Sequence, residues 1–578
     1  MSALLTGNLP LIADAPDGIR KLRGLILDLA VRGKLVPQDA GDEPARELLN
    51  RIAQERTQSE TRVTRKKSAP PPVTRELEPS FALPQGWEWA SVGELSSLVR
   101  GVSYNKSQAA ATQLAGYIPL LRGHNINQHL NFEDLVYVPG ELISNDQLVR
   151  LGDIVIALSS GSAHLVGKAA QVDKNVTCGI GAFCGVVRAH SIELYQYFGL
   201  FFQTPYYRHR VAAHGKGIGI NNLQKGALLA LECPLPPLPE QHRIVAKVDE
   251  LMALCDRLEA EQADAEAAHA RLVDALLTAL ARSTDAADFA ANWQRLAAHF
   301  DTLFTTEAAI DALKQTVLQL AVMGKLVPQD PNDEPASELL DWITVERSGL
   351  EAAGKIRKSK PLQEIEDAAQ PFPLPPNWAW ARLGEVTLES GAGWSPNCES
   401  RRRENDEWGV LKVSAVSWGI FKPDENKALP SNLQPRPDCE VVQGDFLVSR
   451  ANTAELVARS VWVESCPQRL MLSDKIVRLK LSQHMNGRFV NLANTCAHAR
   501  SYYAAVAGGT SSSMKNVSRE QILNLAIPLP PIAEQHRIVT KVDELMALCD
   551  RLKADLVFAR ENRARLADAL VQAALQAA

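Results

Sequence analysis

The chain has 578 residues, with 62 Lys and Arg against 67 Asp and Glu, and 46% of its residues are hydrophobic. This composition excludes a mainly disordered chain, and no apolar run of about 18 residues predicts a transmembrane helix. The N-terminus lacks the basic and apolar segments of a secretory signal, and the nine scattered cysteines contain no CxxC pair. We therefore expect a cytoplasmic, multidomain protein without a disulfide scaffold or structural zinc.

The same framework occurs twice along the chain. Residues 241–258 (QHRIVAKVDELMALCDRL) return as residues 535–552 with one change, Ala246 to Thr540. Three further segments recur, which are LAVRGKLVPQD as LAVMGKLVPQD, LPQGWEWASVGEL as LPPNWAWARLGEV, and PLPPLPEQHRIV as PLPPIAEQHRIV. A period of about 290 residues is too long for one solenoid repeat. The pattern predicts an internal duplication of a domain pair.

Short helical segments are predicted ahead of each globular part. They cover two pairs of equivalent positions, 17–33 with 308–324 and 44–56 with 335–347. We expect all four to thicken the long helices described below into a bundle. The charged, proline-rich residues 61–80 and 354–373 are interpreted as linkers or exposed loops.

Two globular blocks, residues 84–235 and 373–530, diverge more than the repeated framework around them. Each is predicted to be a mixed α/β domain with a largely antiparallel sheet. Strand-like segments cover residues 117–121, 153–158, 183–188, 410–416, 445–449 and 475–480, and a helix is expected at 192–202. Both blocks contain a Gly-Asp segment, GDIVIALSSGSAHLVGKA and GDFLVSRANTAELVARS.

Two long helices follow the globular blocks, and apolar residues recur along them at heptad spacing. The first seam contains Ile244, Val248, Leu251, Cys255, Leu258, Gln262, Ala265, His269, Leu272, Leu276 and Ala279. The second contains Ile538, Val542, Leu545, Cys549, Leu552, Leu556, Ala559, Arg563, Leu566, Leu570 and Ala573. This spacing favours a coiled coil, although an amphipathic helix packed on its own domain has a similar pattern. We expect antiparallel pairing, with polar residues such as His269 fixing the register rather than binding a ligand.

The predicted fold class is therefore α+β, with two mixed α/β domains joined by long antiparallel coiled-coil helices and related by a pseudo-two-fold axis. Five regions are expected, which are a helical region with a linker (1–83), domain 1 (84–238), a spacer helix with the second helical region (239–372), domain 2 (373–532) and a C-terminal spacer helix (533–578). In this arrangement the two globular domains lie at opposite ends of the helices.

Loops rich in Arg, Asn, Ser and Gly suit DNA better than a catalytic role. Examples are LRGHNINQ, SSGSAHLVGK and HGKGIGINNLQK in domain 1, and SRANTAE, GGTSSSMKN and the arginines at 401–403 in domain 2. Arg reads guanine and Asn or Gln reads adenine in the major groove, while Ser, Thr and Lys hold phosphates. No phosphate-binding loop, HExxH or GxSxG motif occurs, and no catalytic or metal-binding residues are predicted.

The doubled LAVxGKLVPQD and PLPPxxEQHRIVxKVDELMALCDRL segments resemble the specificity subunit of type I restriction-modification enzymes. The resemblance spans nearly the whole chain. It implies a subunit without chemistry of its own, whose two target recognition domains each read half of a split DNA sequence. It also implies that the helices set the gap between the halves and dock two modification subunits, which bind S-adenosylmethionine and methylate adenine. Motor–nuclease subunits would join these and use ATP and Mg²⁺ to cut DNA.

The resemblance also gives candidate DNA-binding residues in each domain by position. In domain 1 these are Arg122, His124, Asn125, Ser159, Ser160, Lys168, Lys216, Asn221, Asn222 and Lys225. In domain 2 they are Lys412, Ser414, Arg450, Asn452, Thr510, Ser511, Ser512 and Lys515. Arg459 is a possible counterpart of Lys168, but the spacing leaves this open. The competing hypothesis is a coiled-coil adaptor whose globular ends bind proteins.

Overall fold

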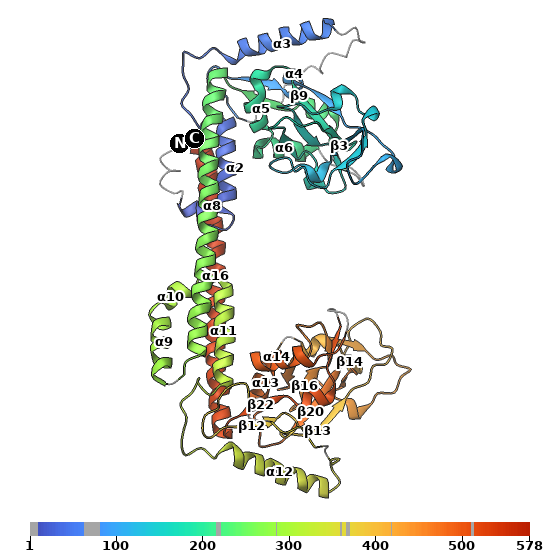
Figure 1. The fold of residues 1–578 in the computed structure, drawn as a ribbon, viewed down its shortest axis with the longest axis vertical. Coiled ribbons are helices and arrows are strands. Elements are labelled where there is room, and N and C mark those ends of the chain that lie inside the picture. Colours follow the sequence, from blue (N-terminus) through green and yellow to red (C-terminus); the bar gives the residue numbers. More distant parts are fainter. Residues whose placement is uncertain are drawn as a thin grey trace. The chain divides into compact units, whose positions relative to one another are not determined.

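The computed structural model describes residues 10–62, 81–214, 221–284, 286–358, 361–365, 370–417, 419–509 and 514–577 (Figure 1). Most of the predicted linker at 61–80 therefore lies outside the described residues. Contacts divide the chain into two compact units, Met1–Glu266 with Phe558–Ala578, and Ala267–Val557. Within the described ranges, no helix is both long enough and apolar enough to cross a bilayer.

Unit 1 contains domain 1 together with its helical framework. Its helices are α2 (Gly18–Val31), α3 (Ala45–Arg62), α4 (Val92–Leu95), α5 (Tyr195–Phe201), α6 (Pro205–His214), α7 (Lys225–Leu229), the first part of α8 (Leu238–Ala281) and the last part of α16 (Ile532–Ala577). Its strands are β1 (Glu88–Ser91), β2 (Ser96–Arg100), β3 (Tyr117–Leu121), β4 (Val136–Pro139), β5 (Ile154–Ala157), β6 (Ser159–Ser160), β7 (Ala169–Gln171), β8 (Gly179–Ile180), β9 (Cys184–Ala189), β10 (Asn221–Asn222) and β11 (Glu232–Leu235).

Unit 2 contains domain 2 and the second copy of the framework. Its helices are the last part of α8, α9 (Ala286–Ala298), α10 (Phe300–Leu303), α11 (Glu307–Val322), α12 (Ala336–Ala352), α13 (Gly487–Thr495), α14 (Ala497–Val506), α15 (Arg519–Leu523) and the first part of α16 (Ile532–Ala577). Its strands are β12 (Ala379–Arg382), β13 (Thr387–Ala392), β14 (Gly409–Leu411), β15 (Asn426–Ala428), β16 (Phe446–Ser449), β17 (Ala451–Asn452), β18 (Ser460–Trp462), β19 (Leu470–Met471), β20 (Ile476–Leu481), β21 (Lys515–Asn516) and β22 (Ala526–Leu529).

The two domains share one sheet topology. Domain 1 has a four-stranded sheet β2-β9-β5-β7 and a three-stranded sheet β4-β3-β8, and domain 2 repeats them as β13-β20-β16-β18 and β15-β14-β19. All pairs are antiparallel except β3 with β8 and β14 with β19. The predicted mixed α/β class is thus confirmed. Each of the six predicted strand segments contains an observed strand, but 410–416 ends as a strand at Leu411 and continues as a 3₁₀ turn.

The shared Gly-Asp segment has a structural role in each sheet. Gly152 and Gly444 adopt φ of 90° and 85°, which favour glycine. The buried Asp153 then accepts hydrogen bonds from the Arg150 amide at 2.8 Å and from the Arg188 guanidinium at 2.9 and 2.6 Å. Because the carboxylate is buried, it needs this complete set of partners. The segment therefore closes a loop rather than binding a ligand.

The repeated framework residues build the same joint around a buried glutamate in each unit. Joint 1 is formed by Gln38, Asp42, Trp87, Glu240 and Arg243. The Trp87 indole N–H donates to Glu240 Oε2 at 2.9 Å, and the Gln38 amide donates to its Oε1 at 3.1 Å. Arg243 binds the Asp42 carboxylate through two nitrogens, at 3.3 and 2.6 Å. The joint thereby ties the LVPQD loop, the first strand of domain 1 and the start of α8 together.

Joint 2 repeats every one of these contacts with Gln329, Asp333, Trp378, Glu534 and Arg537. The Trp378 and Gln329 donors reach the two carboxylate oxygens of Glu534 at 2.9 and 2.6 Å, and Arg537 binds Asp333 at 3.2 and 2.5 Å. The repeated segments therefore form the same hydrogen bonds and ion pair in both units.

The predicted heptad seam holds over the first part of α8 and then shifts by one residue. Ile244, Val248, Leu251 and Cys255 are buried, but Leu272 is 52% exposed. The buried residues there are Val273, Leu277 and Leu280. An α-helix falls behind a heptad repeat by about 20° per heptad, so after four heptads the next residue faces the partner. The prediction for Leu272 is therefore wrong.

The same shift occurs in α16. Ile538, Val542 and Cys549 are buried, whereas Leu566 is 49% exposed and Ala567 is buried in its place. In unit 1 the core joins Ile244 and Val248 with Ala567 and Ala574, and in unit 2 the core joins Val273 and Leu277 with Ile538 and Val542. Each unit thus contains the beginning of one long helix and the end of the other, as antiparallel pairing predicts.

Two polar residues of the α8 seam bind backbone groups. The Gln262 amide donates to Ala13 O at 3.1 Å, and His269 Nε2 lies 3.2 Å from Thr302 O. Arg563 is exposed and lies outside the core. This contact joins His269 to α10, so the register role between the long helices stays a prediction.

Only half of the predicted bundle helices pack on the long helices. α2 and α11 do so, with Arg23 bound to Asp256 and Glu259 at 2.6 Å each (Figure 1). α3 and α12 instead pack on the globular domains. The Arg347 guanidinium of α12, for example, donates to the carbonyls of Gly384 and Thr387 at 3.0 and 3.1 Å. The prediction for 44–56 and 335–347 is therefore corrected, because an apolar helix face does not specify its partner.

Candidate nucleic-acid interface

A two-stranded polar ladder is present at equivalent positions in the two domains. Ladder 1 pairs β6 with β10, so that Asn221 lies opposite Ser160 and Asn222 opposite Ser159. The Ser159 hydroxyl donates to Asn222 Oδ1 at 2.7 Å. The structure therefore brings together four predicted residues that are about 60 positions apart in the sequence.

Ladder 2 pairs β17 with β21, with Asn452 opposite Lys515 and Ala451 opposite Asn516. The Asn452 amide donates to the Ser417 hydroxyl at 3.0 Å, and Lys515 Nζ donates to Gly509 O at 2.7 Å. Arg450, just before the ladder, has its backbone bonded on both sides, to Lys475 O and from Val517 N, at 2.9 Å each. Both ladders thus hold polar side chains on a fixed backbone.

The backbone identifies Arg459 as the counterpart of Lys168. In domain 1 the amide of Gly167 donates to Ala157 O and that of Ala157 donates to Lys168 O. In domain 2 the amide of Ala458 donates to Ser449 O and that of Ser449 donates to Arg459 O. Gly167 and Ala458 share a left-handed φ, of 74° and 58°. The alignment that the spacing left open is therefore settled, and each domain has a cation at this position.

Polar partners hold these two cations in place. Lys168 Nζ lies 3.0 Å from the Asn127 side-chain oxygen, and Arg459 Nε donates to Glu455 O at 3.2 Å. Neither contact neutralises the charge, because both acceptors are uncharged. Both side chains are partly exposed, so their charges remain available to an anion.

The loop from Arg122 to Asn125 contains both exposed and buried candidates. Asn125 is 0% exposed, accepts from the Arg122 amide at 2.9 Å, and donates to Glu133 O at 2.8 Å. Its prediction as a DNA contact is corrected, since its amide closes the loop. The Arg122 guanidinium donates to Asp134 O at 2.9 Å. His124, which lies between Arg122 and Asn125 in the sequence, is exposed.

Lys412 and Ser414 lie at the corresponding loop of domain 2. The Ser414 hydroxyl donates to Glu425 Oε2 at 2.8 Å, and Lys412 Nζ is 3.5 Å from the same oxygen. The hydrogen bond from Ser414 and the charge of Lys412 lower the pKa of Glu425 below its ordinary value. The charge of Lys412 is thus partly balanced within the domain.

Four predicted residues, Lys216, Thr510, Ser511 and Ser512, lie outside the described residues. Lys225 is described and exposed at the start of α7.

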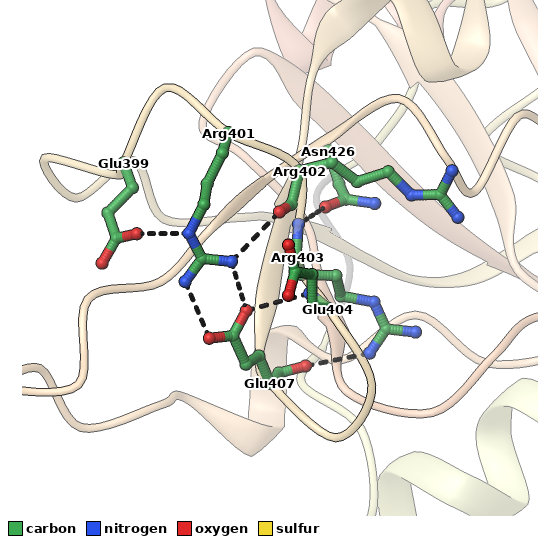
Figure 2. Close-up of polar contacts among 7 residues, drawn as sticks. All are labelled: Glu399, Arg401, Arg402, Arg403, Glu404, Glu407 and Asn426. Atoms are coloured by element: carbon green, nitrogen blue, oxygen red, sulfur yellow. Dashed lines mark hydrogen bonds and ion pairs between the residues drawn. The ribbon is translucent and has the colours of Figure 1, made fainter.

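The arginines at 401–403 were expected among the exposed polar loops, and the structure uses them inside domain 2 (Figure 2). Arg401 binds both oxygens of Glu407 at 2.7 Å and Glu399 at 2.8 Å. The bonds from Arg401 lower the pKa of Glu407 to about 2. Arg402 pairs with Asp424, and Arg403 donates to two backbone carbonyls. Two of the three charges, those of Arg401 and Arg402, are therefore paired with carboxylates of the same domain, which composition alone did not reveal.

Sequence reasoning did not select two exposed residues beside the ladders. Phe183 follows β8 and Lys475 follows β19, each on a turn that hydrogen-bonds to its ladder segment. No motif marks either residue, so only the fold places them next to the candidates. Within the described residues, no group of three His, Cys, Asp or Glu side chains is arranged to hold a metal ion.

Comparisons with known proteins assign this arrangement to a family. The family model for the type I restriction modification DNA specificity domain matches residues 84–267. The HsdS subunit from Thermoanaerobacter tengcongensis, a crystal structure, is similar at 18% identity with a TM-score of 0.40, covering 86% of this chain and 98% of that one. The EcoEI and EcoAI specificity subunits of Escherichia coli are 40% and 34% identical to this chain, each over 96% of it and 94% of the relative. The chain therefore belongs to the specificity subunits of type I restriction-modification enzymes.

Proposed function

We propose that each globular domain reads one half of a split DNA sequence. The observation that carries the proposal is the duplication of the ladder together with its cation. Each domain presents Asn and Ser or Lys on a fixed two-stranded ladder, with Lys168 or Arg459 nearby. Asn can bind adenine edges, and hydroxyls and cations can bind phosphates. The side chains differ between the domains, so the two half-sites differ.

We infer different roles for the candidates from their surroundings. Asn222 and Asn452 present amides beside their ladders and are suited to base edges. Lys168, Arg459 and Lys515 are suited to phosphates, since each retains its charge against uncharged partners. Four further candidates lie near these groups in the sequence or in the strand pairing and complete the proposed surface. They are His124, Ser160, Lys225 and Arg450.

The long helices, on this proposal, set the gap between the half-sites and dock two modification subunits. The chain itself performs no chemistry. The modification subunits bring S-adenosylmethionine and methylate adenine, and motor–nuclease subunits bring ATP and Mg²⁺ for cleavage. The resemblance that these segments carry supports this division of labour, which takes place in the cytoplasm.

Charge neutralisation tests the proposal against the adaptor hypothesis. Replacing Lys168, Lys216, Arg450 and Lys515 by Ala, in complex with the modification subunit, should weaken DNA binding. Each lost phosphate contact should reduce the slope of log affinity against log salt by about 1. Arg46→Ala is the control, because Arg46 lies in α3, outside the ladders and the long helices, and pairs with Glu88 at 3.3 Å. Binding that keeps its affinity and slope in the quadruple variant would support a protein-binding adaptor.

A further inference from the structure

Phe183 is an exposed aromatic residue on a fixed turn of domain 1. Its side chain is 66% exposed, and the Cys184 amide donates to Gly181 O at 2.9 Å to close the turn. Single exposed apolar residues are common on protein surfaces. The significance of Phe183 therefore depends on what surrounds it.

The turn is attached to the proposed DNA-reading surface on two sides. The carbonyl of Phe183 accepts from the amides of Leu158 and Ser159 at 2.9 and 3.1 Å. The Gly181 amide donates to Leu121 O at 2.9 Å, directly before Arg122. The turn that carries the ring is thus hydrogen-bonded both to the strand of ladder 1 and to the residue before Arg122, which holds its backbone in place. An ordered backbone loses little entropy when the ring contacts a ligand.

Domain 2 has Lys475 at the equivalent position. The carbonyl of Lys475 accepts from the Arg450 amide at 2.9 Å, and the Ile476 amide donates to Ser473 O at 3.1 Å to close the same turn. Lys475 is exposed and lies 3.3 Å from the Asp474 carboxylate. One backbone position therefore carries an uncharged ring in one domain and an ammonium group in the other.

We propose that Phe183 contacts a base of the half-site that domain 1 reads, whereas Lys475 contacts a phosphate. The inference rests on the proposed function of the two domains. A phenyl ring cannot bind phosphate, but it can pack on a thymine methyl group or insert at a base step. An ammonium group binds phosphates without regard to sequence. Phe183 is then a specificity-determining residue.

The test uses the full chain with its modification subunit and duplexes that vary at each base pair of both half-sites. Phe183→Ala should lower affinity for the preferred sequence about tenfold and flatten the preference at one or two adjacent base pairs of one half-site. Phe183→Lys, which carries the residue of domain 2, should regain affinity without regaining the preference. Lys475→Ala should weaken all sequences alike and reduce the salt slope by about 1.

Two further probes separate the modes of contact. Replacing thymine by deoxyuridine should reduce the affinity of the unmodified chain to that of Phe183→Ala if the ring packs on the methyl group. Insertion should instead raise 2-aminopurine fluorescence at the contacted step, and Phe183→Ala should abolish the rise. An unchanged base preference in Phe183→Ala would overturn the inference, provided that exchanging residues 84–235 still changes one half-site. If that exchange changes nothing, the proposed function itself fails.

Discussion

At the residue scale, the buried glutamate of each joint must accept hydrogen bonds at both of its carboxylate oxygens. Glu240 and Glu534 are both 1% exposed, and burial raises the pKa of each above its ordinary value. Each carboxylate accepts one indole N–H and one amide N–H, one at each oxygen. Both oxygens are needed, because two donors converge on them.

Glu240→Gln should therefore reduce the free energy of unfolding by about 1–3 kcal/mol, since glutamine offers one acceptor oxygen to the buried Trp87 indole N–H and the part-buried Gln38 amide. Urea denaturation of the two proteins measures the difference. Glu250→Gln on the same helix is the matched control, because Glu250 forms a surface pair with Lys247 at 2.8 Å and should change stability by less than about 1 kcal/mol. Equal losses in the two variants would contradict the role given to the joint.

Burial of His498 should make the stability of unit 2 depend on pH. Burial lowers the pKa of His498 below its ordinary 6.5, and its ring packs 5.8 Å from Trp380. Tyr206 occupies the equivalent position beside Trp89 and Phe81. The unfolded chain binds a proton near pH 6.5 that the folded chain resists, so stability falls as pH drops below that value.

His498→Tyr, which copies unit 1, should make the free energy of unfolding less dependent on pH between about 7.5 and about 5.5. Denaturation curves at several pH values measure this dependence for both proteins. A variant with the same pH dependence as the unmodified chain would show that His498 does not contribute.

At the element scale, ion pairs join each short helix to one long helix, and the positions of one of these pairs have opposite charges in the two units. Arg23 of α2 binds Asp256 and Glu259 of α8. Lys314 of α11 likewise pairs with Asp550 of α16, but the residue equivalent to Glu259 is Lys553, which binds Asp311 at 2.9 Å. The residue equivalent to Asp311 in α2 is Arg20. The two charges have therefore changed sign together, although Arg20 itself pairs with Asp17 at 3.0 Å and Glu259 is bound by Arg23.

Lys553→Glu should lower the thermal unfolding midpoint of the chain, because it places three carboxylates together with Glu307 and Asp311. The decrease should be smaller than for Glu534→Gln, since this contact is on the surface. Adding Asp311→Arg, the arrangement of unit 1, should restore the midpoint. A double variant no more stable than Lys553→Glu would argue against the pairing.

Local pattern predicted the elements better than their partners. Alternating and heptad spacing identified the strands, the short helices and the long helices, because burial on one face imposes these periods. The seam shifted by one residue at Leu272 and Leu566 because a helix has 3.6 residues per turn. α3 and α12 were assigned to the wrong surface, since a helix face records that it is buried but not against what.

At the scale of the whole molecule, the duplication predicted the architecture, but only the fold assembled the sites. Ser159 and Asn222 lie in loops of suitable composition and were selected by position from the resemblance, and the ladder that joins them depends on pairing across about 60 residues. Asn125 and the arginines at 401–403 have side chains suited to DNA, but they form hydrogen bonds within their own domains. Phe183 had no sequence signal at all. Residue type alone cannot distinguish a polar group that is hydrogen-bonded within a loop from one that is able to bind a ligand.

Mapping methylated adenines across the genome of a host that carries the chain with its modification subunit tests the central claim most directly. The unmodified chain should give a bipartite sequence with a fixed gap. Exchange of residues 84–235 for those of another specificity subunit should change one half and leave the other half and the gap unchanged. A continuous methylated sequence, or a change in both halves, would contradict the assignment of one half-site to each domain.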